Sequence, residues 1–255
     1  MRKIKSFLII AVLLVIVTSL NAQEEGVVIN GIRWATRNVD APNTFTINPE
    51  DAGMFYQWNR KIGWSSTNPM INSDGGTTWD VSMPEGDSWG KTNDPCPTGW
   101  RIPTLEELQS LVAAGSQWTT KNGVYGRYFG SGEQTVFFPA AGSRYFYGGT
   151  LLSVGVDGMY WSETPYPSLS WRAYHMYLHS SGVYMYYYER NNGHSVRCVA
   201  DGNVGVNEVS SDTEDITVIG YFDILGKRLN EEPNQGIYII LYNNGKTKKV
   251  MIFKD

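Results

Sequence analysis

Asp94-Pro95-Cys96-Pro97-Thr98-Gly99-Trp100-Arg101-Ile102-Pro103-Thr104 contains one of the only two cysteines in the 255-residue chain. The other cysteine, Cys198, lies about 100 residues downstream in Ser195-Val196-Arg197-Cys198-Val199. Behind an export leader, an even pair of cysteines indicates a disulfide. A bridge closing a loop of about 100 residues would restrict the unfolded chain by roughly 4 to 5 kcal/mol in the entropic account. We therefore predict a Cys96–Cys198 bond in a domain that functions outside the cytoplasm.

A helix is predicted directly after the first of these stretches. Thr104 and Glu107 fit the Thr-x-x-Glu capping box, Pro103 precedes them, and Gly115 can end the helix. The apolar residues between recur at helical spacing, namely Leu105, Leu108, Leu111 and Val112.

Strands are predicted for most of the remaining regular structure. Alternating or β-rich runs separated by Gly, Asn, Ser and Pro cover residues 26–34, 135–139, 158–162, 173–178, 182–188 and 195–199. One main helix against several short strands, with long irregular connections, predicts the α+β class.

The composition divides the chain into four parts. Residues 1–22 have a basic start, an apolar run at 7–17 and small residues before Ala22, which predicts a cleaved signal peptide. The rival interpretation is an uncleaved membrane anchor, which needs about 20 apolar residues. The apolar run at 7–17 is shorter than this, and the sequence has no second apolar run of that kind. We predict one domain over residues 23–200, a charged linker over 201–215, and a small all-β domain over 216–255. The β-prone runs of this last part are 216–219, 221–225, 236–242 and 248–253, with a hairpin turn at Asn243-Asn244-Gly245.

The charge disfavours nucleic acid as a partner. The full chain has a formal net charge of −4, and removal of residues 1–22 takes away three basic and no acidic residues, which gives −7. A surface that binds phosphates needs a basic excess or a basic stripe. Lys246, Lys248 and Lys249 form the densest basic group and are interpreted as solvated strand residues.

Six sequence blocks in the predicted domain at 23–200 resemble, in the same order, those of the Fibrobacter succinogenes major paralogous domain. They are Trp34-Ala35-Thr36-Arg37-Asn38-Val39, Gly53-Met54-Phe55-Tyr56-Gln57-Trp58, the stretch 94–104, Phe138-Pro139-Ala140-Ala141-Gly142-Ser143-Arg144, Gly158-Met159-Tyr160-Trp161-Ser162 and Ser195-Val196-Arg197-Cys198-Val199. This resemblance implies a C-type-lectin-like fold akin to the formylglycine-generating enzyme group, in which a cysteine near the helix is tied to a late strand. It implies no established chemistry.

The tail carries a second resemblance. Tyr221-Phe222-Asp223-Ile224-Leu225-Gly226-Lys227-Arg228, Gly236-Ile237-Tyr238-Ile239-Ile240 and Lys248-Lys249-Val250 resemble the C-terminal sorting domain of type IX secretion substrates. That resemblance implies an immunoglobulin-like β-sandwich read by outer-membrane export machinery, and therefore a location at the outer-membrane surface or outside the cell.

No catalytic residue, metal site or cofactor is predicted. The sequence has no Gly-x-Ser-x-Gly motif, and Glu106 and Glu107 are interpreted as a helix cap and a solvated face. His175 and His179 would share one face of a strand, but a zinc site needs further ligands that no Cys or His supplies at a recognisable spacing. Glu232-Pro233-Asn234 spells a calcium-lectin triplet but falls in the tail, where coincidence explains it better.

The region between Tyr160 and Tyr188 is the densest in aromatic residues. Tyr and Trp give large, stiff, amphipathic contacts and are typical of recognition surfaces. Part of the set must fill a core, and we predict this for Trp161 and for one face of the alternating Tyr184, Tyr186 and Tyr188. Because a strand at a sheet surface cannot bury both faces, others stay exposed. The predicted ligand-binding residues are Trp171, Tyr174, Tyr177, Tyr187, Arg190 and Asn192.

The function that these patterns favour is a non-catalytic, adhesin-like binding protein, secreted or displayed on the cell surface. Its partner would be a glycan or a surface protein, and its tail would engage the type IX secretion machinery. No membrane span is expected after cleavage. Two alternatives stay open: a structural component of the cell envelope, and an enzyme related to formylglycine-generating enzymes, which would require Cys96 and Cys198 to be free thiols in a pocket.

Overall fold

The structure, a computed structural model, describes residues 24–202, 218–223, 226–233, 235–243 and 247–252. The described chain forms two compact units, with the division at residues 206 and 207. The predicted signal peptide and all but the first two residues of the predicted linker lie outside the described residues. Among the described residues, no helix combines the length and the apolar character that a membrane crossing requires.

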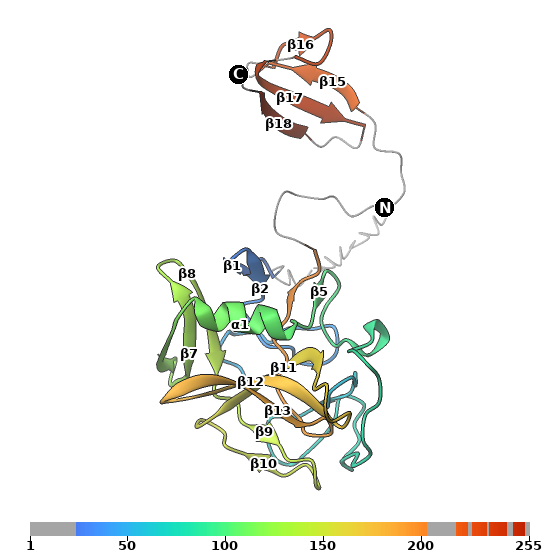
Figure 1. The fold of residues 1–255 in the computed structure, drawn as a ribbon, viewed down its shortest axis with the longest axis vertical. Coiled ribbons are helices and arrows are strands. Elements are labelled where there is room, and N and C mark those ends of the chain that lie inside the picture. The colour runs from blue at the N-terminus through green and yellow to red at the C-terminus, as the bar shows by residue number, and fades with distance from the viewer. Residues whose placement is uncertain (1–23, 203–217, 224–225, 234, 244–246, 253–255) are drawn as a thin grey trace, which may run out of the picture. The chain divides into compact units, whose positions relative to one another are not determined.

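The described residues of the first unit form five sheets (Figure 1). A four-stranded sheet has the order β1 (Val27–Ile29), β2 (Ile32–Trp34), β14 (Val199–Ala200) and β5 (Trp100–Arg101). Two three-stranded sheets consist of β6 (Ser116–Lys121), β7 (Val124–Ser131) and β8 (Gln134–Pro139), and of β11 (Gly158–Pro165), β12 (Arg172–His179) and β13 (Gly182–Glu189). Two small hairpins pair β3 (Phe55–Tyr56) with β4 (Gly63–Trp64), and β9 (Ser143–Arg144) with β10 (Leu151–Leu152). A 3₁₀ turn covers Lys91–Asn93.

The part of the second unit that the structure describes forms one antiparallel sheet. Its order is β16 (Arg228–Leu229), β15 (Val218–Phe222), β17 (Gly236–Tyr242) and β18 (Thr247–Ile252). Glu232, from the calcium-lectin triplet, accepts hydrogen bonds from the hydroxyls of Tyr238 (2.5 Å) and Tyr221 (3.3 Å). The turn residues 244 and 245 lie outside the described residues.

The predicted helix is present as α1 (Leu105–Ala113), with the predicted cap. The Thr104 hydroxyl accepts from the backbone N–H of Glu107 (3.2 Å), and the Thr104 N–H donates to the Glu107 carboxylate (2.8 Å). Arg101 donates two hydrogen bonds to the same carboxylate, at 2.8 and 2.6 Å. Glu107 is thus committed to the helix start, where a negative charge is favoured.

The predicted α+β class is wrong. Helix α1 has nine residues and is the one α-helix in the described residues, whereas strands build every layer of both units. The fold is therefore β-rich, with one short helix packed on a sheet. The hairpin formed by β6 and β7 turns at Asn122 and Gly123, both at positive φ, and it was not predicted. The C-type-lectin-like and formylglycine-generating-enzyme-like architecture is not confirmed.

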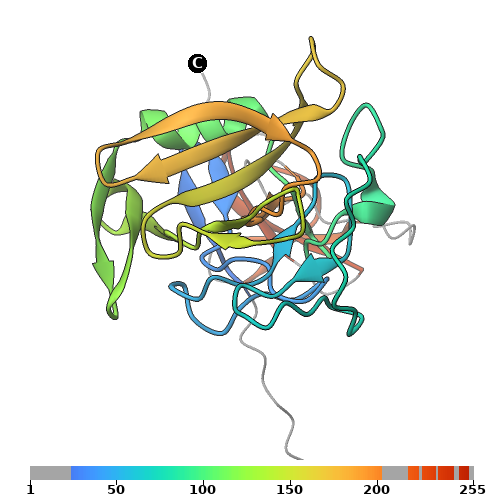
Figure 2. The same ribbon diagram turned by 90° about the horizontal axis from the view of Figure 1, so that it is seen from below.

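Helix α1 packs on one face of the β11–β12–β13 sheet. The buried side chains of Leu108 and Leu111 belong to one apolar cluster with Phe138, Tyr160 and Met176. The β9–β10 hairpin lies on the opposite side of the same sheet (Figure 1), and Figure 2, seen from below, shows this hairpin in yellow-green beside the orange strands β12 and β13. The sheet therefore has one face that packs on α1 and the core, and a second face on which α1 does not pack.

The segment 193–199 is buried along its whole length and ties three parts of the first unit together. Cys198 C=O accepts from the N–H of Ala35 (2.9 Å), and Ser195 pairs with β11 through Met159 and Trp161. The sulfur atoms of Cys96 and Cys198 are bonded, with the Cα atoms 6.1 Å apart. The structure thus contains the disulfide expected from the sequence, inside a second apolar cluster that includes Trp58 and Trp161.

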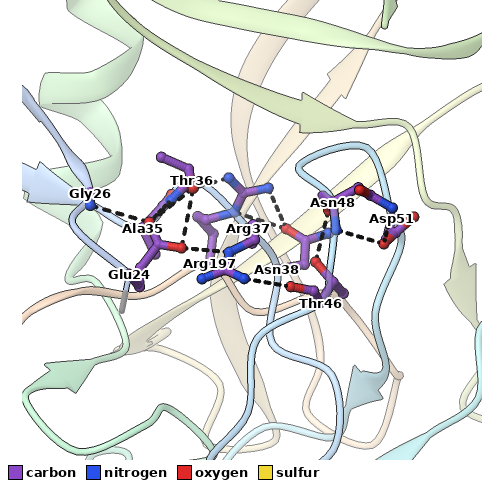
Figure 3. Close-up of polar contacts among 10 residues, drawn as sticks. All are labelled: Glu24, Gly26, Ala35, Thr36, Arg37, Asn38, Thr46, Asn48, Asp51 and Arg197. Atoms are coloured by element: carbon purple, nitrogen blue, oxygen red, sulfur yellow. Dashed lines mark hydrogen bonds and ion pairs between the residues drawn. The ribbon is translucent and has the colours of Figure 1, made fainter. Parts of the chain in front are cut away.

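Arg197 places a guanidinium in the interior, at 1% exposure. It donates to Asn38 Oδ1 through Nε (2.9 Å) and Nη2 (2.7 Å), and to the Ala35 carbonyl (3.1 Å), as Figure 3 shows for Asn38. Its carbon Cζ lies 4.4 Å from the centre of the Phe138 ring. Burial lowers the pKa of Arg197 to about 10, so the group remains charged at neutral pH.

The Glu24 carboxylate, at the start of the described chain, also holds the segment 35–38 in place. The Glu24 carboxylate accepts from the Thr36 N–H (2.8 Å), the Thr36 hydroxyl and Arg37 Nε (2.7 Å), and its side chain is 4% exposed (Figure 3). These bonds lower the pKa of Glu24 against the opposing effect of its burial. The segment 35–38 is therefore anchored to Glu24 and to Arg197.

Replacing Asn38 tests how strongly this buried charge is compensated. Asn38→Leu removes the acceptor of two guanidinium bonds, so we expect the free energy of unfolding to fall by about 3 to 5 kcal/mol, as for a buried charge left without its partner. Urea unfolding at neutral pH measures this change. The double variant Asn38→Leu/Arg197→Met, which removes the charge as well, should be more stable than Asn38→Leu alone. Equal midpoints for Asn38→Leu and the unchanged protein would contradict the assignment.

Candidate functional site

A cavity of about 380 Å³ opens on the face of the β11–β12–β13 sheet that is turned away from α1. The sheet contributes Met159, His175, Tyr177, Tyr186 and Tyr188. The region of the β9–β10 hairpin contributes Ser143, Tyr145, Leu152 and Ser153, and the chain after β13 contributes Asn192 and His194. The cavity lies entirely within the first unit.

Strand alternation brings the aromatic side chains to this face. His175 is in register with Tyr186 on β13 and with Trp161 on β11, and Tyr177 is in register with Tyr184 and Met159. Because residues two apart in a strand point to the same side, these residues and Tyr188 share one face. The intervening residues Met176 and Leu178 point to α1 and the core.

Two histidines form the floor of the cavity. The side chains of His175 and His194 are 3% and 2% exposed, and their ring centres are 4.7 Å apart. His194 stacks on Trp161 at 4.1 Å, and His175 meets the same indole edge-on at 5.8 Å. Nδ1 of each ring is enclosed and has no hydrogen-bond partner in the described structure. Most buried polar atoms are paired, so these two nitrogens are exceptions, and because they are enclosed they do not face the cavity.

Burial also sets the charge of both rings. It lowers the pKa of His175 to about 3. Burial, and then the proximity of His175, lower the pKa of His194 well below its usual value. A desolvated imidazole favours its uncharged form, so both rings are neutral at physiological pH.

The backbone around His194 is fixed on both sides. Tyr56 and His194 exchange N–H···O=C bonds of 2.8 and 3.0 Å, and Arg144 and Gly193 exchange two of 2.8 Å. A Cβ atom at Gly193 would approach Trp79 to 2.8 Å and the Cβ atoms of Arg144 and Phe55 to within 3.2 Å. Only glycine fits this approach, and it lets the segment run close enough to carry His194 under the sheet face.

The predicted ligand-binding residues are separated by the structure. Tyr177 and Asn192 line the cavity, and Trp171 is exposed at the turn before β12. Tyr174 and Tyr187 lie on the helix side of the sheet, half-buried, and Tyr187 stacks on Tyr166 with ring centres 4.0 Å apart. The six predicted residues therefore do not form one site.

Arg190 and Asn192, predicted to contact a ligand, are both buried. Arg190 donates to the Gly86 carbonyl (2.8 Å) and the Arg172 carbonyl (3.2 Å), and its Cζ lies 4.0 Å from the centre of the Trp58 ring. Asn192 donates to the Glu189 carbonyl (2.9 Å) and accepts from the Phe146 N–H (3.0 Å). Both residues hold loops in place, although an edge of Asn192 still reaches the cavity.

The prediction of which aromatic side chains are buried was correct for one residue and not for the alternating tyrosines of β13. Trp161 is buried, as predicted. Tyr184, Tyr186 and Tyr188, predicted as partly structural, are exposed, with Tyr186 at 57%. Their alternation was visible in the sequence, but nothing local indicated that the intervening residues Val183 and Met185 pack against the core. His175 and His194 had no sequence signal that would link them, since the two are separated by 18 other residues and lie on different segments.

A second hollow, of about 580 Å³, lies beside the disulfide and is lined by charges of both signs. Burial raises the pKa of Asp94 and of Glu163 there. The Asp94 carboxylate accepts from the backbone N–H groups of Cys96 (2.8 Å) and Ile102 (3.4 Å), which fixes the loop at the disulfide. Within the described residues, no cluster of His, Cys, Asp and Glu is arranged to hold a metal ion.

The neutral state of His175 makes stability depend on pH. The native ring has a pKa of about 3, whereas the unfolded ring has one near 6.5. Between these values the unfolded chain binds a proton that the native protein does not, so stability falls as pH decreases from about 6.5 toward 3. The expected slope is about 1.4 kcal/mol per pH unit for this one group. In urea unfolding at several pH values, His175→Phe should remove this increment from the total slope. Identical slopes for His175→Phe and the unchanged protein would show that the ring is not held neutral.

Comparison with known proteins identifies the family. Residues 57–200 match the family described as the Lcl C-terminal domain. This range contains every residue that lines the cavity and both cysteines of the disulfide. No curated protein and no solved structure matches the chain. Because the matched residues make up more than half of the sequence, the chain belongs to the Lcl C-terminal domain family.

Proposed function

We propose that the protein is an exported, non-catalytic binding protein whose ligand enters the cavity on the β11–β12–β13 sheet. The observation that carries the proposal is the combination of exposed tyrosines with two buried histidines that line the floor of one hollow. Ligand sites in proteins are typically concave and mostly apolar, with a few polar groups that fix orientation. The cavity has this composition.

The aromatic rim supports recognition of a partner. Tyr184 and Tyr186 are both more than half exposed, and Tyr188 stands next to them on the same strand face. Exposing several large rings side by side is unfavourable in water, and such patches commonly mark interaction sites. Tyr gives a stiff, amphipathic surface at a small cost in conformational entropy. A glycan or a surface protein would benefit from such a surface.

The polar contacts of the site support binding without catalysis. In the described residues, neither His175 nor His194 is hydrogen-bonded to a serine or a carboxylate. A nucleophile needs such a base within hydrogen-bond reach. Ser181 contacts His179 at 2.9 Å, but this pair lies in the exposed turn between β12 and β13. With Cys96 and Cys198 joined, the route to free catalytic thiols also loses its support.

Export and surface delivery are part of the same proposal. They rest on the leader-like residues 1–22 and on the tail, whose motifs resemble type IX sorting domains. The resemblance to the major paralogous domain agrees with a location on the cell surface. Delivery by the type IX machinery would leave the first unit outside the cell, where a glycan or a protein ligand can reach the cavity.

Removing the tyrosine rim tests the binding role. The exported protein is applied to a glycan array and to immobilised collagen, fibronectin and laminin. We expect saturable binding to at least one of these surfaces, with a loss of tenfold or more in Tyr186→Ala/Tyr188→Ala, since two contact rings together contribute at least about 1.4 kcal/mol. Both side chains are exposed, so the fold should survive the change.

The matched control is Tyr125→Ala. Tyr125 is 52% exposed, similar to Tyr186, but it lies on β7 and stacks on Trp118, away from the cavity. This variant should bind as the unchanged protein does. Binding to none of the surfaces, or equal loss in the control and the double variant, would contradict the proposed function.

A further inference from the structure

We propose that the cavity is selective for an uncharged sugar residue whose hydroxyl groups bond to the imidazoles of His175 and His194. The inference rests on the proposed binding function and narrows its ligand to one chemical class. It is argued from the walls, the floor, the charge and the size of the cavity.

The walls suit a flat ring with apolar faces. Tyr177, Tyr186 and Tyr188 come from the sheet, and Tyr145 comes from the side of the β9–β10 hairpin. Aromatic rings give apolar contact over their faces and polar contact at the tyrosine hydroxyls. A pyranose has the matching pattern, since its C–H groups gather on the ring faces and its hydroxyls lie around the edge.

The floor supplies one ring nitrogen of each histidine, Nε2, to which no described residue is hydrogen-bonded. In both His175 and His194, Nδ1 is the enclosed and unpartnered nitrogen. This leaves Nε2 as the ring atom that can reach a ligand in the cavity. A neutral imidazole carries one donor and one acceptor nitrogen. A sugar hydroxyl can both donate and accept, so it fits either tautomer, whereas a carboxylate can only accept.

The charge of the cavity excludes ionic ligands. Its lining contains no Asp, Glu, Lys or Arg, and the two imidazoles are uncharged. The Asp157 carboxylate, outside the lining, interacts with the Tyr177 hydroxyl and supplies no positive charge to an anion. A carboxylate or sulfate buried there would lose its hydration without gaining a counter-charge, which costs several kcal/mol. The full chain is also acidic, with a formal charge of −4. A quaternary ammonium could stack on the tyrosine faces, but it has no hydrogen-bonding group for the two imidazoles.

The volume sets the size of the ligand group. About 380 Å³ lies near the lower end of the roughly 300 to 1,000 Å³ found for small-molecule sites. This space accommodates a terminal sugar residue, and the exposed Tyr184 beside it can contact the next residue of a longer glycan. The site is therefore suited to the end of a neutral glycan and not to the middle of a charged polysaccharide.

The test is a titration of the full exported chain, followed through its histidine NMR signals. The uncharged probes are the methyl glycosides of glucose, galactose, mannose and N-acetylglucosamine, and the charged probes are glucuronate, glucose 6-sulfate and tetramethylammonium. We expect saturable shifts of the His175 and His194 signals with at least one uncharged glycoside, and binding at least tenfold weaker for every charged probe. Preference for a charged probe, or binding of none of the seven, would overturn the inference.

Variants locate the binding within the cavity. His175→Phe keeps a ring of similar size but loses the hydrogen bond, so affinity for the bound glycoside should fall tenfold or more. Tyr125→Ala, on β7 and away from the cavity, is the control and should bind normally. If His175→Phe does not fold, Tyr186→Ala, which removes an exposed wall, must give the loss instead. Unchanged affinity in the folded cavity variants would contradict the assignment.

The two proposals can fail separately. If Tyr186→Ala/Tyr188→Ala weakens binding to an immobilised surface but no uncharged glycoside binds, the binding function stands and the sugar assignment falls. If an uncharged glycoside binds but the cavity variants leave its affinity unchanged, the glycoside binds elsewhere, and the cavity is not the binding site in either proposal.

Discussion

The guanidinium of Arg197 is held in the interior by Asn38, by the Ala35 carbonyl and by the face of Phe138. A buried charge is tolerated only when its hydrogen bonds are satisfied. The contacts of Arg197 therefore fix the segment 35–38, strand β8 and the buried segment 193–199 relative to one another. The disulfide at the next residue, Cys198, ties the same segment to the loop before α1. Three residues before Arg197, His194 enters the cavity. The position of the site is thus a direct consequence of how a charged residue is accommodated in the core.

Local chemistry made part of the fold predictable. The Thr104–Glu107 capping box depends on neighbouring residues only, and helix α1 begins where the sequence indicated. Strand periodicity located β12 and β13 to within a residue or two. The predicted strand at 26–34 is instead the hairpin of β1 and β2, because Asn30 and Gly31 both adopt positive φ. The predicted α+β class was wrong because one helix of nine residues was counted as a full helical layer, and because the β6–β7 hairpin was not predicted.

The site was less predictable, since it depends on contacts between distant segments. Alternation showed that the tyrosines of β13 fall into two sets, but only the packing of Met185 against the core decides which set faces outward. Arg190 and Asn192 are turn residues of a kind that usually lies at the surface. Here they are buried because carbonyl groups of other loops and the Trp58 ring offer them partners. The pairing of His175 with His194 follows from the sheet register and the close approach at Gly193, neither of which leaves a motif.

Fold and function meet in the charge state of the two imidazoles. Their burial among Trp161 and the surrounding tyrosines keeps them uncharged, and this neutrality is what suits the cavity to hydroxyl groups instead of ions. The most direct measurement is a long-range ¹H–¹⁵N correlation spectrum of the imidazole nitrogens of the full exported chain at about pH 5. An ordinary histidine with a pKa near 6.5 is mostly protonated there. The account predicts the nitrogen shifts of a neutral ring for both His175 and His194. Imidazolium shifts for either residue would contradict it.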